Sequence, residues 1–317
     1  MTPLLDVQHL TVSFGGVPVV RDLSFQMHKG RTLCLVGESG SGKSMTAFSI
    51  MRLVPEPGRI VSGSIRFDGE DLLSLNEKAM RGRRGRDISM IFQEPMTSLN
   101  PVLRIGRQIA EPLELHEGLS RREALARAAE LMDMVGIPDA SRRLDDWPHQ
   151  FSGGMRQRAM TAMALACSPR LLLADEPTTA LDITIQGQIL RLLSRLGRER
   201  DMGVLLITHD LGVVAEAADD VAVMYAGELV EQAPVKEFFA QPLHPYAEGL
   251  MACAPLVGNH AARRLPSIPG MVPLPSELPE GCAFRPRCPH ASEICRKAPP
   301  LTAVSEAHTV RCWLHAK

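Results

Sequence analysis

The chain has 317 residues, a formal net charge of −1 and 45% hydrophobic residues. A chain of this length can bury a large core, and its composition is ordinary for a globular protein. The near-zero charge argues against a general nucleic-acid-binding protein, which usually carries a basic excess. No apolar run approaches the roughly 18 residues that span a bilayer, and the N-terminus lacks the basic start and long apolar stretch of a signal peptide. We therefore expect a cytoplasmic chain that reaches a membrane only through a partner.

Two segments near the N-terminus, residues 4–36 and residues 63–69, are predicted to contain short strands. Residues 4–36 contain alternating apolar positions and the turn Gly15-Gly16, which is typical of β-structure. Residues 63–69 are short, alternating and bounded by glycines. We expect both segments to form strands.

A glycine-rich stretch fits the pattern G-x-x-x-x-G-K-[ST], which wraps nucleotide phosphates. Its residues are Gly37, Glu38, Ser39, Gly40, Ser41, Gly42, Lys43 and Ser44. Glycines let successive backbone N–H groups turn toward one point, and the helix predicted after Lys43 aims its positive end at the same anion. Lys43 adds a charge for the β- and γ-phosphates, and the Ser44 hydroxyl can ligate Mg²⁺. An apolar strand at 32–36 precedes the stretch, which argues against a flexible linker.

Residues 88–92 are predicted to form a buried strand that ends at Gln93. From residue 99 to residue 147 the pattern becomes helical. Ser120 and Glu123 have the spacing of a capping box, in which each side chain satisfies a free N–H group at a helix start. We therefore predict a helical insertion in a nucleotide-binding domain.

An apolar strand over 171–174 ends in the acid pair Asp175-Glu176. Beside a phosphate loop, Asp175 is where a second carboxylate should hold Mg²⁺. Glu176 leaves the strand one residue later, where it could polarise an attacking water. Two surface acids in a turn would be the plainer interpretation, but an apolar strand seldom ends in such a pair by chance.

A helix over 183–200 and a strand over 203–208 are predicted next. The strand ends at His209. Ligands of open α/β sheets bind outside the carboxyl ends of the strands. The position of His209 therefore indicates the ligand edge, although a histidine considered alone is more often structural.

Residues 151–158, Phe-Ser-Gly-Gly-Met-Arg-Gln-Arg, resemble the signature motif of ABC ATPases, in the form with Phe where Leu is commoner. The glycine-rich loop, Gln93, the acid pair, a D-loop at Leu181-Asp182 and His209 follow the family's order and spacing over residues 4–235. The resemblance implies an α/β fold: a P-loop (RecA-like) ABC ATPase core with an antiparallel β subdomain and a helical subdomain at about 95–168. It implies a nucleotide-binding domain over 1–235 and a C-terminal extension over 236–317.

The resemblance also implies residue roles. In the family an aromatic residue at the position of Phe14 stacks on adenine, and the loop at 37–44 holds the phosphates of ATP. Glu176 would be the general base, His209 would brace the water and the γ-phosphate, and Gln93 would sense the metal. The implied catalytic set is Glu176, His209, Gln93 and Lys43, and the implied Mg²⁺ set is Ser44, Gln93 and Asp175.

The signature residues would complete the ATP site of another subunit. Ser152, Gly153 and Gly154, with Gln157, are assigned to ATP bound across a dimer. Their backbone N–H groups and the start of the following helix would bind the phosphates in the same way as the phosphate loop does. The resemblance therefore implies that hydrolysis needs a dimer, and that ATP favours closure by contacting both halves.

Residues 91–101 and 241–246 resemble the corresponding sequence motifs of dipeptide/oligopeptide and nickel importers. The nickel members usually lack a long C-terminal extension, which favours peptides. The resemblance implies an ATP-hydrolysing importer subunit at the cytoplasmic face of the inner membrane. Its implied partners are two permease subunits, a second ATPase that is either a different chain or a copy, and indirectly an extracytoplasmic peptide-binding protein, with no nucleic acid. A nickel or other small-solute importer, and a non-transport ABC ATPase, are the alternatives.

The extension carries four of the seven cysteines: Cys282, Cys288, Cys295 and Cys312. In a cytosolic chain such a cluster favours metal over disulfides, but no gap has the short spacing of a zinc finger. Residues 281–289 resemble peptide-importer sequences that carry a [4Fe–4S] cluster on four thiolates. The resemblance therefore implies an iron–sulfur cluster, while zinc and free thiols remain alternatives.

Other functional classes fit less well. A P-loop kinase has no reason to contain Ser152-Gly153-Gly154. An exporter is commonly fused to membrane helices, and translation-type ABC proteins carry two nucleotide domains in tandem. A catalytically silent binding module is disfavoured by the intact Glu176 and His209.

Overall fold

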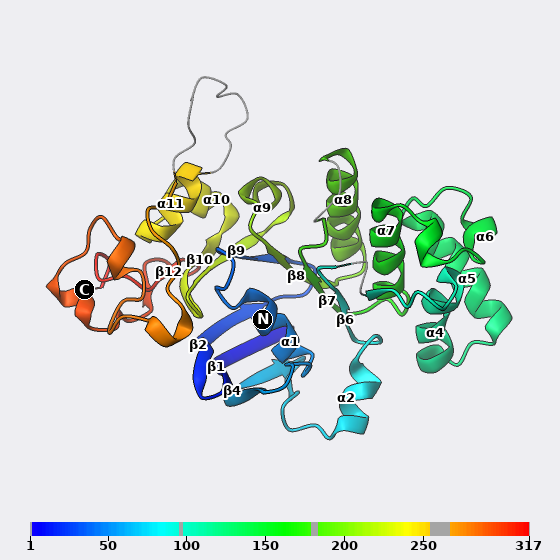
Figure 1. Ribbon diagram of the computed structural model, residues 1–317, viewed down its shortest axis with the longest axis horizontal. Coiled ribbons are helices and arrows are strands. Elements are labelled where there is room, and N and C mark those ends of the chain that lie inside the picture. Colours follow the sequence, from blue (N-terminus) through cyan, green and yellow to red (C-terminus); the bar gives the residue numbers. More distant parts are fainter. Residues whose placement is uncertain (1, 95–97, 179–182, 254–266, 317) are drawn as a thin grey trace. The chain divides into compact units, whose positions relative to one another are not determined.

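The computed structural model describes residues 2–94, 98–178, 183–253 and 267–316 (Figure 1). The chain divides into two compact units. Unit 1 comprises Met1–Met27, Thr32–Leu73 and Ile207–Lys317, and unit 2 comprises His28–Arg31 and Ser74–Leu206. The predicted D-loop lies outside the described residues, and the predicted domain boundary after residue 235 stays a prediction.

A four-stranded antiparallel sheet forms the N-terminal part of unit 1. Its order is β2 (Val17–Met27), β1 (Leu5–Phe14), β4 (Gly58–Phe67) and β5 (Glu70–Asp71). Along β1 the fully buried side chains are Leu5, Val7, Leu10 and Val12. Their alternation shifts between Val7 and Leu10, where the pairing with β2 is irregular. The predicted antiparallel β subdomain is confirmed, although β4 begins at Gly58 rather than at Gly63.

Unit 1 also contains strands of a larger sheet. Within it, the neighbours run in the order β11 (Thr302–Ala303), β12 (Thr309–Val310), β10 (Glu228–Pro234), β9 (Asp220–Tyr225) and β3 (Thr32–Val36). β3 and β9 are parallel, and the other pairs are antiparallel. The C-terminal extension therefore continues this sheet, which its Pro-rich sequence did not indicate.

The helices of unit 1 are short. They are α1 (Lys43–Ile50), α9 (Leu211–Ala217), α10 (Val235–Ala240) and α11 (Pro245–Cys253). Single 3₁₀ turns occur at η2 (Pro275–Glu277), η3 (Arg285–Arg287) and η4 (Glu293–Arg296). The helix predicted after the glycine-rich loop is confirmed, because α1 begins at Lys43.

Unit 2 combines parallel strands with helices. β6 (Ile88–Ile91) pairs in parallel with β7 (Leu171–Asp175), and β7 neighbours β8 (Gly203–Thr208), of which residues 203–206 belong to this unit. The helices are α2 (Glu77–Arg83), α4 (Ile105–Glu117), α5 (Arg121–Met134), α6 (Ala140–Arg143), α7 (Gly153–Ala164) and α8 (Ile183–Glu199), with a 3₁₀ turn η1 (Pro148–Gln150). Helices α4 to α7 gather at one end of the unit, where α4, α5 and α7 contact one another (Figure 1). The predicted helical insertion is thus present as several helices.

Local sequence signals set several boundaries. Ser120 caps α5, and its capping box with Glu123 is complete in both directions. The predicted strand over 203–208 matches β8.

Across the described ranges, none of the helices has the length and apolarity needed to cross a membrane.

A buried carboxylate fastens the C-terminal extension to β10. Glu231 is 0% exposed. It accepts hydrogen bonds from the Leu243 N–H at 2.9 and 3.1 Å and from the His244 N–H at 2.7 Å. His308, which is also buried, lies 2.9 Å away through Nε2. One side chain therefore joins β10, the two residues before α11 and the segment before β12.

We expect Glu231→Gln to destabilise this region by about 3 kcal/mol, because the new amide would point a donor at other donors in a buried site. The measurement is hydrogen exchange of the amides of residues 243–253 and 309–310, with the thermal midpoint as a second readout. The exposed Glu280→Gln serves as the control and should change stability by less than about 0.5 kcal/mol. Equal behaviour of the two variants would contradict this role.

Candidate functional site

The glycine-rich loop lies in unit 1 between β3 and α1. Gly37, Gly40 and Gly42 have positive φ angles of 155°, 80° and 99°. A Cβ atom on Gly37 would lie 2.2 Å from the Met224 carbonyl oxygen, and one on Gly42 would lie 2.9 Å from that of Val19. Both the dihedrals and the space therefore require glycine at these two positions.

Lys43 is held inside the loop. Its side chain is buried, at 7% exposure for the residue. Nζ donates to the carbonyl oxygens of Gly37 at 2.8 Å and Glu38 at 2.9 Å, and to Ser41 Oγ at 3.2 Å. The Lys43 ammonium group could instead donate to phosphate oxygens. These acceptors are charged and therefore make stronger hydrogen bonds with the ammonium group than carbonyl oxygens do.

His209 lies near the start of the loop. A cavity of about 370 Å³ in unit 1 is lined by Val36, Gly37, Glu38, His209, Asp210, Leu211, Leu250 and Cys253. The structure thus brings the predicted His209 together with two residues of the predicted phosphate loop. The contribution of α11 through Leu250 and Cys253 was not predicted.

Phe14 ends β1 and packs against β4. A Cβ atom on Gly58 would lie 2.5 Å from Phe14 Cζ, so the ring covers this glycine. The side chain is half-buried. Its stacking on adenine stays a prediction.

The predicted base and the predicted sensor meet in unit 2. Because β6 and β7 are parallel neighbours, the residues after their carboxyl ends lie at the same edge. Gln93 Nε2 donates to Glu176 Oε2 at 3.1 Å. Glu176 has a φ of 46°, an uncommon value for a residue with a side chain and one that recurs at functional sites. Asp175 is the last residue of β7 and is 2% exposed.

The signature segment forms an open helix start. Ser152 caps α7, and its Oγ accepts from the Met155 N–H at 3.3 Å. Ser152 and Gly153 are exposed, and no neighbouring atom lies within 4 Å of a Cβ placed on Gly153. Exposed N–H groups at the start of a helix favour anions.

Gln157 has a different role from the predicted one. It is 0% exposed, and its Nε2 donates to the Pro177 carbonyl oxygen at 2.6 Å. A fully buried side chain cannot reach a nucleotide on another subunit. Gln157 instead fastens α7 to the segment after Asp175 and Glu176.

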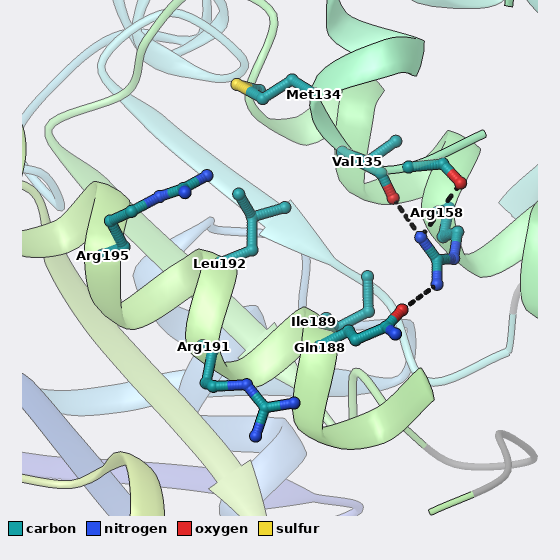
Figure 2. A pocket seen from close by; sticks show the side chains of 9 residues that line it. Met134, Val135, Arg158, Gln188, Ile189, Arg191, Leu192 and Arg195 are labelled. Atoms are coloured by element: carbon teal, nitrogen blue, oxygen red, sulfur yellow. Dashed lines mark hydrogen bonds between the residues drawn. The ribbon is translucent and has the colours of Figure 1, made fainter. Parts of the chain in front are cut away.

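Arg158 joins three helices of unit 2, as Figure 2 shows. Nη1 donates to the carbonyl oxygens of Val135 at 2.6 Å and Gly136 at 3.1 Å, after the end of α5. Nη2 donates to Gln188 Oε1 on α8 at 2.7 Å. A cavity of about 380 Å³ lies beside these contacts. The spacing of the signature motif could not predict this role, because the partners lie elsewhere in the chain.

The four cysteines of the extension line one cavity of about 80 Å³ in unit 1. Burial, followed by the charges of the neighbouring cysteines, raises the pKa of Cys282 to about 11. Burial also raises the pKa of Cys288 and Cys312. None of these four described cysteines forms a disulfide. Among the described residues, no group of three or more His, Cys, Asp or Glu side chains is arranged so that it could hold a metal ion.

We expect Arg158→Met to lower the free energy of unfolding of unit 2 by about 2–4 kcal/mol, because buried carbonyl oxygens lose a charged donor. Urea unfolding followed by circular dichroism measures the change. Arg195→Met, at an exposed arginine lining the same cavity, is the matched control and should change stability by less than about 0.5 kcal/mol. A loss no greater than that of the control would show that the three contacts contribute nothing measurable.

Comparison with known proteins agrees with this geometry. Residues 20–179 match the family described as "ABC transporter", and residues 230–295 match "Oligopeptide/dipeptide transporter, C-terminal region". The chain is 54% identical to a putative peptide import ATP-binding protein of Brucella abortus (strain 2308), over 98% of this chain and 96% of that protein. It is 51% identical to the oligopeptide transport ATP-binding protein OppD of Salmonella typhimurium (strain LT2), over 98% and 93%. A solved dimeric ATP-binding cassette bound to ADP and Pi aligns with a TM-score of 0.67 and 26% identity, over 73% of this chain and 98% of that chain.

Proposed function

This chain belongs to the ABC transporter family and is an ATPase of that family, and from this premise we propose that it drives the import of di- and oligopeptides. The observation that carries the peptide assignment is the match of residues 230–295 to the oligopeptide/dipeptide transporter C-terminal region. The similarity to peptide import ATP-binding proteins over 98% of the chain supports it. The same similarity disfavours the nickel alternative.

In the proposed mechanism, the loop at 37–44 binds the phosphates of ATP through converging N–H groups. Lys43 moves from carbonyl acceptors to phosphate oxygens and offsets their charge. Phe14 would stack on the adenine. Ser44, Gln93 and Asp175 would hold Mg²⁺, and the buried carboxylate of Asp175 fits a hard oxygen-binding cation. When bound, Mg²⁺ would neutralise charge on the phosphates.

Glu176 is proposed as the general base. It would accept a proton from water as the water oxygen attacks the γ-phosphorus and the bond to the ADP oxygen breaks. The hydrogen bond from Gln93 at 3.1 Å orients the carboxylate. His209 would hold the water and the γ-phosphate.

Ser152, Gly153 and Gly154 are proposed to bind the ATP of a second subunit. Ser152 and Gly153 are exposed at the start of α7 and Gly154 is partly exposed, which leaves this surface open to an anion on another chain. The second subunit is either a related ATPase or a copy of this chain. Two permease subunits at the cytoplasmic face of the inner membrane would complete the importer, with an extracytoplasmic peptide-binding protein acting through them.

The four-cysteine site is proposed to hold a [4Fe–4S] cluster, with zinc and free thiols as the alternatives. Four cysteines around one cavity supply the number and type of donors that such a cluster takes, but their side chains, as described, are not arranged to hold a metal ion and would have to turn toward one point. Burial raises the pKa of Cys282, Cys288 and Cys312, so these thiols carry protons that they must release to bind metal. A bound cluster would crosslink the turns that carry the cysteines.

We expect Glu176→Gln to bind ATP, form a persistent dimer and lose about 10²–10³ in hydrolysis rate, because the base is removed while the phosphate contacts stay. The measurement is peptide-stimulated phosphate release by the reconstituted transporter, with ATP binding measured separately. Glu199→Gln, at an exposed glutamate of α8, should keep the wild-type rate. Normal turnover in Glu176→Gln would exclude it as the base, and stimulation by nickel but not by peptide would favour the alternative substrate.

Anaerobic purification is expected to give iron and sulfide bound to the chain, with broad visible absorption. Cys288→Ser should remove both, whereas the buried Cys167→Ser should keep them. If the cluster has a structural role, its loss in air should lower the thermal midpoint. Zinc without iron, or four thiols that all react with a thiol reagent, would contradict the cluster.

A further inference from the structure

Glu38, the second residue of the phosphate loop, is contacted by two parts of the C-terminal region. Arg287 Nη1 donates to Glu38 Oε2 at 2.6 Å, and Arg287 Nη2 donates to Glu38 Oε1 at 3.0 Å. The Glu38 N–H donates to the Tyr246 hydroxyl at 2.8 Å. All three residues lie in unit 1. The backbone and the side chain of Glu38 are thus both fixed from outside the loop.

Arg287 is itself tightly held. Its side chain is only 5% exposed. Nε donates to the Pro269 carbonyl oxygen at 2.9 Å, and Nη2 donates to that of Ile268 at 3.3 Å. The guanidinium carbon lies 5.7 Å from the ring centre of Tyr225 and 5.8 Å from that of Phe284. The bidentate ion pair between Arg287 and Glu38 therefore has a defined geometry, because the arginine side chain is buried and held by these other contacts, unlike that of an exposed ion pair.

The contact continues to the lysine that meets the phosphates. The Glu38 carbonyl oxygen accepts from Lys43 Nζ at 2.9 Å. Fixing Glu38 therefore fixes one of the acceptors that position Lys43. Glu38 also places a negative charge on the wall of the cavity that Gly37 and His209 share. Without a neutralising partner, that carboxylate would repel the phosphates of a nucleotide.

We propose that Arg287 is a positioning residue of the nucleotide site, which fixes and neutralises Glu38 so that the phosphate loop binds ATP tightly. The proposal rests on the proposed binding of ATP by this loop. Arg287 belongs to the turn η3, whose next residue is Cys288. The extension is therefore a functional part of the ATP site, in addition to any role in contacts with other subunits.

The test is nucleotide affinity of the full-length chain, measured by calorimetry with ATP and with ADP. Arg287→Ala should raise the Kd for ATP about 10- to 100-fold, because the loop loses a constraint and gains an unneutralised carboxylate. The Kd of Arg287→Lys for ATP should lie between those of wild type and Arg287→Ala, since an ammonium group cannot make the bidentate contact. The exposed Arg296→Ala, on the neighbouring turn η4, is the matched control and should bind as wild type.

A cycle with Glu38→Gln separates this role from a general effect on folding. If Arg287 acts through Glu38, Arg287→Ala should raise the Kd much less in the Glu38→Gln background. In the assembled transporter, the KM for ATP should rise in Arg287→Ala while kcat at saturating ATP stays within about twofold. The proposal would be overturned if Arg287→Ala raised the Kd for ATP equally in the wild-type and Glu38→Gln backgrounds. A fall in kcat with no change in KM would overturn it as well.

Two further outcomes are decisive. If the wild-type chain does not bind ATP, the proposed function fails. If wild type binds and Arg287→Ala binds equally well, only the role of Arg287 fails. Should Arg287→Ala not fold, Arg287→Lys in the two Glu38 backgrounds gives the same cycle, and the absence of coupling there would exclude the proposal.

Discussion

The conformation of the phosphate loop in unit 1 depends on one steric constraint, the close approach of the loop to the end of β9. Gly37 passes the Met224 carbonyl oxygen so closely that a Cβ atom would lie 2.2 Å from it. Gly42 passes Val19 in a similar way, at 2.9 Å. Because the backbone lies against two strands, its N–H and C=O groups have few orientations left. The carbonyl oxygens that hold Lys43 are therefore set by the packing beneath the loop.

Much of this arrangement could be predicted from the sequence, because its signals are local. An apolar run followed by a polar residue marks the strand and the end at which the site residues are proposed, as at β7 with Asp175 and β8 with His209. The capping box at Ser120 and the start of α1 at Lys43 depend on residues within one turn. Such features do not need knowledge of the rest of the chain.

The remaining features depend on contacts between distant segments. Arg287 and Glu38 are 249 residues apart, and no periodicity connects them. β11 and β12 have two residues each, too few to show alternation. Gln157 belongs to a recognisable motif, but the motif does not show which side of α7 is buried. Sequence patterns therefore point to candidate residues for chemistry more readily than to the residues that hold those candidates in place.

The two units divide the proposed chemistry. Unit 1 carries the phosphate loop, His209 and the arginine that neutralises Glu38, whereas unit 2 carries the Gln93–Glu176 pair and the signature segment. In this proposal the phosphate loop and Arg287 of unit 1 bear on nucleotide affinity, whereas His209 of unit 1 and the Gln93–Glu176 pair of unit 2 bear on turnover. Because Arg287 comes from the extension, the proposed role of this arginine makes the fold of that region one determinant of nucleotide affinity in unit 1. Substitutions at Arg287 and at Glu176 are therefore expected to act on different steps, the first on binding and the second on hydrolysis.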